Sequence, residues 1–77
     1  MAHRDPWDYI IRVLDAYGQT LREFFMIWAD LETSIRRARH LYKVWCSPER
    51  SATRVEVRDT ENRLVFYKED GAEFFNH

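Results

Sequence analysis

The residue types that could do chemistry are few and widely spaced in this chain of 77 residues. His40 and Cys46 come closest to a nucleophile–base pair, but six residues apart on one helix they do not face each other. The C-terminal end of a helix disfavours a thiolate. Cys46 is therefore expected to be a passive, partly buried residue, with an intermolecular disulfide as the alternative. Enzyme activity is not predicted.

Metal, cofactor and phosphate sites are not predicted either. No two His or Cys residues have the spacing of metal ligands, and His3 and His77 lie near the ends of the chain. Asp5 and Asp8 are neighbouring carboxylates, but beside Pro6 a local cap is the simpler interpretation. Two glycines cannot build a phosphate-binding loop. No cofactor and no small-molecule substrate is expected.

One cluster of charge could contact a polyanion. The net charge is −1, yet residues 31–50 carry five basic and two acidic side chains, or +3. Clustered cations bind phosphates. The candidates for an electrostatic or nucleic-acid contact are Arg36, Arg37, Arg39 and Lys43. The nearby Tyr42 and Trp45 fall on the core-facing stripe, where they are poorly placed to stack on bases. Nucleic-acid binding is therefore the alternative hypothesis and not the leading one.

Two similar stretches indicate which elements position these residues. Asp15 is followed three positions later by Gly18, and Asp59 is followed at the same spacing by Asn62. An Asp side chain closes a tight turn, and Gly and Asn tolerate a positive φ. Around the second stretch, apolar and charged residues alternate with the period of a strand. Both stretches are therefore predicted to be hairpin turns.

A helical alternative exists for the first 45 residues. Apolar residues recur there with the three-four spacing of a coiled coil or helical hairpin. Before residue 30, however, apolar side chains also fill the positions that a helix would turn toward water. Gly18 would in addition cost about 1 kcal/mol inside a helix. The alternative fold is mostly α, with a long helix or helical hairpin followed by a C-terminal β-hairpin.

Between the two hairpins the helical pattern is clear. Asp30 is the predicted N-cap, and the helix is expected to end at Cys46-Ser47-Pro48. Its apolar stripe consists of Leu31, Ile35, Ala38, Leu41, Tyr42 and Trp45. The predicted fold is α+β: a single ββαββ domain over residues 8–70, with one helix packed on a four-stranded antiparallel or mixed sheet. Residues 1–7 and 71–77 are expected to be short tails.

The predicted sheet has an apolar second face, because one helix covers only one face of a small sheet. Strand alternation places Ile11, Val13, Phe25, Ile27, Val55 and Val57 beneath the helix. The apolar residues left on the opposite face of the first hairpin are Ile10, Leu14, Phe24, Met26 and Trp28. These five would expose about 400–600 Å², at or beyond the largest patch typical of a monomer.

Two explanations account for such a patch. The chain could cover it with its own ends, through Trp7 and Phe74-Phe75. The preferred hypothesis is that another polypeptide covers it, most simply a second copy in a sheet-to-sheet homodimer. The sequence thus predicts a non-enzymatic protein-interaction module, a small adaptor or inhibitor that occludes a partner surface. Inhibition of a nucleoprotein machine, as by small phage inhibitors, belongs to this class. A cytoplasmic location and no membrane partner are expected.

Overall fold

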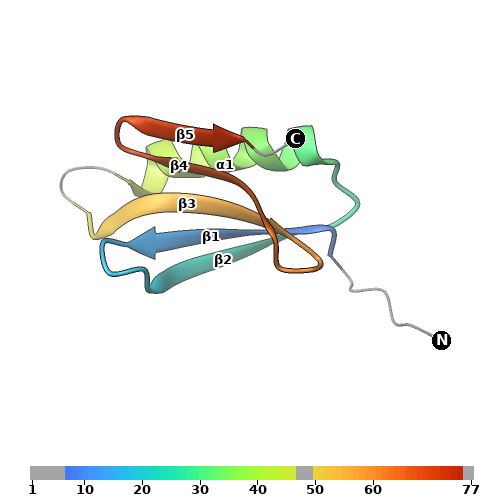
Figure 1. Cartoon of the computed structure of the whole chain (residues 1–77), viewed down its shortest axis with the longest axis horizontal. Coiled ribbons are helices and arrows are strands. Elements are labelled where there is room, and N and C mark those ends of the chain that lie inside the picture. The colour runs from blue at the N-terminus through green and yellow to red at the C-terminus, as the bar shows by residue number, and fades with distance from the viewer. Residues whose placement is uncertain (1–6, 47–49, 76–77) are drawn as a thin grey trace.

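The computed structural model describes residues 7–46 and 50–75, which form one helix packed on one sheet. The elements are β1 (Tyr9–Asp15), β2 (Thr20–Met26), α1 (Leu31–Trp45), β3 (Ala52–Asp59), β4 (Leu64–Glu69) and β5 (Ala72–Phe75). Figure 1 shows α1 lying across one face of the sheet. The α+β class is confirmed. The mostly α alternative is wrong, because residues 9–26 form a hairpin. Within the described ranges, no helix has the length and apolar character to cross a membrane.

The sheet has five strands, one more than predicted, in the order β2-β1-β3-β4-β5. Each neighbouring pair is antiparallel. The additional strand, β5, occupies residues 72–75, which the sequence interpretation assigned to a tail. Asp70 and Gly71 separate it from β4, and Gly71 has a φ of 78°. An Asp-Gly pair between two runs of strand residues is a strong hairpin signal, so this strand could have been predicted.

The turns that begin at Asp15 and at Asp59 are hairpin turns, as predicted, and have the same hydrogen bonds. In each, a carboxylate oxygen of Asp15 or Asp59 accepts hydrogen bonds of 2.9 Å from the backbone N–H groups two and four residues later. The residue three positions after the Asp donates its N–H to the Asp carbonyl. That residue is Gly18 or Asn62, with φ of 81° or 62°. Both loops thus end on a left-handed residue, the form typical of three-residue hairpin connections.

The core lies between α1 and the sheet. Alternate strand residues reach it with fully buried side chains, namely Ile11, Val13, Val55, Val57 and Phe66. The helix contributes Ile35, Ala38 and Leu41 from the predicted stripe. The alternation predicted for β1 and β3 is therefore confirmed. On the last predicted strand, where two sets were left open, the set with Phe66 faces the helix.

The ends of α1 agree with the expected capping. Asp30 is the N-cap, and its carboxylate accepts the Thr33 N–H at 2.8 Å. Hydrogen bonds from Thr33 lower the pKa of Asp30. Cys46 is the C-cap, and its backbone N–H donates to a carbonyl in the last turn of the helix. Ser47 and Pro48, the other residues of the predicted helix end, lie outside the described residues.

The predicted faces of β2 are wrong by one residue. Ile11 pairs with Phe24, so Phe24 and Met26 share the helix side of the sheet. Both pack, partly buried, against the core. Phe25 pairs with Ile10 and lies on the opposite face, where it is 51% exposed. The apolar set assigned to the uncovered face of β2 therefore belongs to the core side.

A β-bulge is the physical reason for this error. Next to the turn, Leu14 pairs with Thr20, but the following pair is Val13 with Arg22. Leu21 is thus an additional residue in β2, without a partner of its own in β1. Without a bulge, the register that begins with the pair Leu14–Thr20 would place all even-numbered residues of β2 on the same face of the sheet as Leu14. One additional residue turns all later side chains to the other face.

Candidate functional site

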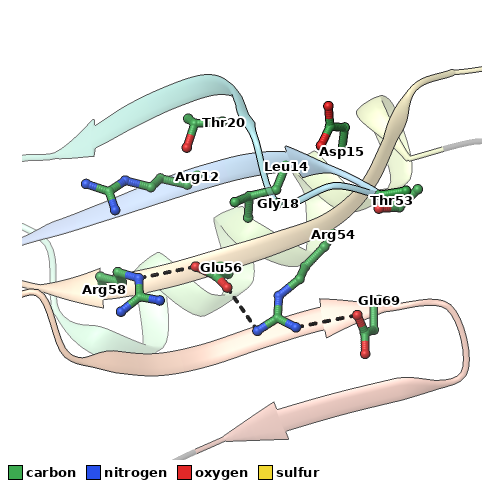
Figure 2. Close-up of a pocket in the computed structure, with 11 residues that line it drawn as sticks. Arg12, Leu14, Asp15, Gly18, Thr20, Thr53, Arg54, Glu56, Arg58 and Glu69 are labelled. Atoms are coloured by element: carbon green, nitrogen blue, oxygen red, sulfur yellow. Dashed lines mark hydrogen bonds and ion pairs between the residues drawn. The ribbon is translucent and has the colours of Figure 1, made fainter.

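The face of the sheet opposite α1 is covered by a network of ion pairs. Figure 2 shows Arg54 between two carboxylates, that of Glu56 at 2.9 Å and that of Glu69 at 3.5 Å. Arg58 reaches Glu56 from the other side at 3.2 Å. Glu56 is only 8% exposed, and a carboxylate so buried needs charged partners. The guanidinium of Arg54 also lies 4.0 Å from the centre of the Tyr67 ring.

The two apolar residues that β1 places on this face are buried. Ile10 is 3% exposed and Leu14 is 8% exposed. In the register between β1 and β3, Ile10 lies beside Arg58 and Leu14 beside Arg54. Arginine side chains can cover apolar neighbours with their aliphatic stems while the guanidinium groups form ion pairs. The charged residues of β3 therefore shelter the apolar residues of β1.

Aromatic side chains contact one another at two further places on this face. Trp7 contacts Phe25, with ring centroids 5.8 Å apart. Phe74 of β5 stacks on Tyr67 of β4, with centroids 5.4 Å apart. A sheet-to-sheet homodimer therefore lacks the broad apolar face on which it was predicted. The homodimer itself stays a prediction.

A hollow of about 510 Å³ on this face is balanced in charge. Its charged lining consists of Arg12, Arg54, Arg58, Asp15, Glu56 and Glu69. Arg12 in turn pairs with Glu23 at 2.9 Å. The hollow is thus lined largely by residues of the ion-pair network that joins the strands. Among the described residues, no group of His, Cys, Asp or Glu could hold a metal ion.

A second hollow, which we call the edge groove, lies between β2 and α1 and has a volume of about 890 Å³. It is lined from the strand by Glu23, Phe24, Phe25 and Met26, and from the helix by Thr33, Arg36, Arg37 and His40. Successive strand residues point to opposite faces of a sheet. Because side chains from both faces of β2 line this groove, it follows the outer edge of the strand. Its strand side is largely apolar and its helix side is largely basic.

The structure separates the residues predicted for a protein interface. Ile10 and Leu14 are buried on the face away from α1, whereas Phe24 and Met26 line the edge groove. Trp28 lies in the connection between β2 and α1, with a φ of 55° and 88% of its surface exposed. Of the five residues, only Phe24 and Met26 come together on one surface.

Sequence reasoning missed the exposure of Phe25 and Ile27. It placed both beneath the helix, but they are 51% and 57% exposed. The bulge at Leu21 reverses the faces, and glycine, which often marks a bulge in a strand, is absent there. Near the end of β2, the side chains on both faces of the strand are apolar, so the hydrophobic pattern did not indicate which face is buried. No sequence signal identified these two residues.

The four basic residues predicted for nucleic-acid contact have different surroundings. Arg36 pairs at 3.3 Å with an acid one turn earlier on α1. The Arg39 Nε donates to Glu73 of β5 at 3.0 Å, and this contact lowers the pKa of Glu73. Arg37 and Lys43 form no ion pair with any residue that the structure describes. Two of these four basic residues are therefore already paired with acids of the same chain.

The residues considered for catalysis are not assembled into a site. His40 lines the edge groove, whereas Cys46 packs partly buried against the core. Burial raises the pKa of the Cys46 thiol, which reduces the nucleophilic thiolate at neutral pH. Asp8 accepts a hydrogen bond at 3.2 Å from the backbone of the connection between β2 and α1. The remaining candidates lie outside the described residues: His3, Asp5 and His77.

No family model, no curated protein and no solved structure matches this chain.

Proposed function

We propose that this chain is a non-enzymatic protein-interaction module that binds its partner at the β2 edge of the sheet. The observation that carries the proposal is the apolar segment at the end of β2. Phe25, which lines the edge groove, is 51% exposed, and Ile27, directly after the end of β2, is 57% exposed. Large apolar side chains that stay exposed together mark interaction surfaces, and buried aromatic anchors dominate the energies of such interfaces.

A role as a small adaptor or inhibitor suits this surface. The anchors lie at one border of the sheet, while the centre of the face opposite α1 is occupied by its own ion pairs. Burying apolar side chains contributes about 25 cal/mol per Å², of which association entropy and side-chain ordering remove a part. A chain that binds with one edge occludes a limited area of its partner, which is how a small inhibitor or adaptor acts.

The test is affinity capture from the native host, with three full-length chains compared side by side. The double variant F25S/I27S removes the exposed anchors. The control Y17S removes a side chain that is 91% exposed in the first hairpin turn. We expect a partner that wild type and Y17S retain and F25S/I27S loses. The purified partner should then bind the double variant at least about tenfold more weakly.

A partner that F25S/I27S retains as well as wild type does would show that another surface binds it. Circular dichroism must show a native spectrum for the double variant, since both side chains are half-exposed and their loss should leave the core intact.

Nucleic-acid binding is the second candidate function. It is supported by Arg37 and Lys43, which form no ion pair within the described chain. A mobility-shift experiment across salt concentrations, with wild type and R37E/K43E, separates the two hypotheses. If the chain is a protein-interaction module, no shift is expected even at low salt. Binding that weakens as salt rises and disappears in R37E/K43E would favour nucleic acid.

A further inference from the structure

We propose that the β2 edge accepts an extended acidic segment of the partner protein as an added antiparallel strand. This inference rests on the proposed function and names what occupies the edge groove. Apolar side chains of the segment would lie beside Phe24 and Met26. Its carboxylates would face the helix side of the groove at Arg37 and His40.

The outer edge of β2 has no neighbouring strand among the described residues. β2 is an edge strand of seven residues, longer than the other edge, β5, which has four. Proteins commonly guard such edges with charged side chains. Here the two charged side chains of β2 are exposed, but each contacts another side chain of the same chain. Glu23 accepts a hydrogen bond from Arg12 at 2.9 Å, and the Arg22 guanidinium lies 5.3 Å from the ring of Trp45.

The edge groove supplies sites for the side chains of an added strand. In this mode of recognition, backbone hydrogen bonds give affinity, and pockets for alternate side chains give specificity. Side chains on the helix side of an added strand would enter the groove beside Phe24 and Met26. Those on the other side would pass along Phe25, which is half-exposed. Both faces of the strand thus find apolar contacts.

The helix side of the groove is neutral at Thr33 and basic from Arg36 to His40, and the one acid of the strand side, Glu23, is paired with Arg12. The chain passes from Met26 through a short connection into α1, and the far end of α1 comes back to Arg22 through Trp45. The first turns of α1 therefore lie near Met26, and His40 lies further toward Arg22. An antiparallel strand would begin opposite Met26. The segment that fits best is accordingly apolar in its N-terminal half and acidic in its C-terminal half.

Charge favours an acidic partner over a second copy of this chain. Arg36 has an acid on its own helix, but Arg37 has none within the described residues. Two β2 edges paired antiparallel about a two-fold axis would carry their helices on the same side of the joint sheet. The basic sides of the two grooves would then face each other, and like charges in an interface are unfavourable. An acidic segment removes this repulsion.

The test is a nuclear magnetic resonance titration of the full-length, ¹⁵N-labelled chain with a nine-residue peptide. The peptide has two valines followed by two glutamates at alternate positions, with threonine elsewhere. We expect shifts of the amide signals of residues 20–26 and of α1 around Arg37. A peptide with lysine in place of glutamate, and one with N-methylated backbone amides, should each bind at least about tenfold more weakly.

Matched variants test the charge. R37E should weaken binding of the acidic peptide by about tenfold and improve binding of the lysine peptide. K43E makes the same change of charge on the same helix outside the groove, and should leave both affinities unchanged.

Three results would overturn the proposal: no shifts at millimolar peptide, equal binding of the N-methylated peptide, or shifts confined to β4 and β5. Shifts in β2 on concentrating the protein alone would also overturn it, in favour of a second copy. If the peptides fail while capture of the partner still depends on Phe25 and Ile27, strand addition falls and the proposed function stands. If capture does not depend on them, the proposed function itself falls.

Discussion

The adjacent residues Phe24 and Phe25 have opposite surroundings, and their substitution should show it. Phe24 packs against the core, whereas Phe25 is half-exposed and touches Trp7. F24A should therefore lower the free energy of unfolding by about 2 kcal/mol, since it removes a partly buried aromatic ring. F25A should lower it by less than about 1 kcal/mol. Urea denaturation of the two variants measures both values. The reverse order would mean that β2 has no bulge.

Gly18 and Asn62 occupy the same place in two equivalent turns, with φ of 81° and 62°. Exchanging them, as in G18N and N62G, should change the free energy of unfolding by less than about 0.5 kcal/mol, because both residue types tolerate this conformation. G18A and N62A should each cost about 1 kcal/mol. A Cβ at Gly18 meets no atom within 4 Å, so the cost there is backbone strain alone.

Chemical denaturation of the four variants compares the two turns directly. If G18N is as unstable as G18A, the first turn does not use its left-handed residue as the second one does.

Among the elements, the turns and the helix could be predicted from the sequence because their signals are local. Asp15 and Asp59 close their turns through their own side chains, and Asp30 caps α1 in the same way. The Asp70-Gly71 pair is likewise a local hairpin signal, and it indicates the strand β5. The bulge at Leu21 had none, because it depends on how β2 packs against β1 and α1 together. The bulge alone reverses the faces of β2.

Two carboxyl groups, Glu73 in the contact between α1 and β5 and Asp30 at the start of α1, should make the free energy of unfolding depend on pH. Hydrogen bonds from Arg39 lower the pKa of Glu73, and those from Thr33 lower the pKa of Asp30. A carboxyl whose pKa is lowered by folding stabilises the protein above its unfolded pKa, which is about 4.3 for Glu and about 3.9 for Asp. That stabilisation is lost as the pH falls through the folded pKa.

The free energy of unfolding should therefore stay nearly constant from pH 7 to about pH 5, and fall below that. E73Q keeps the shape of the side chain but removes its titration. It should be less stable than wild type at pH 7 and should lose less on acidification. Urea denaturation of both proteins at several pH values measures this. Parallel curves for wild type and E73Q would show that the Arg39 contact does not contribute.

The two faces of the sheet are covered in different ways. One face forms the core with α1, and the opposite face is closed by ion pairs around Glu56. The sequence could not show that the five residues predicted for the interface lie apart, because the arginines of β3 cover Ile10 and Leu14, and the bulge turns Phe24 and Met26 toward the core. What the sequence did indicate is that the first hairpin carries more apolar side chains than a single helix buries.

Hydrogen–deuterium exchange of the free chain and of its complex with the captured partner tests whether the edge of β2 is the binding surface. In the free chain, amides of β2 should exchange faster than those of the central strands β1 and β3. Binding should slow exchange in residues 20–26 and in the first half of α1, and leave β4 and β5 unchanged. If the partner instead protects β4 and β5, or leaves β2 as fast as before, the edge of β2 is not the binding surface.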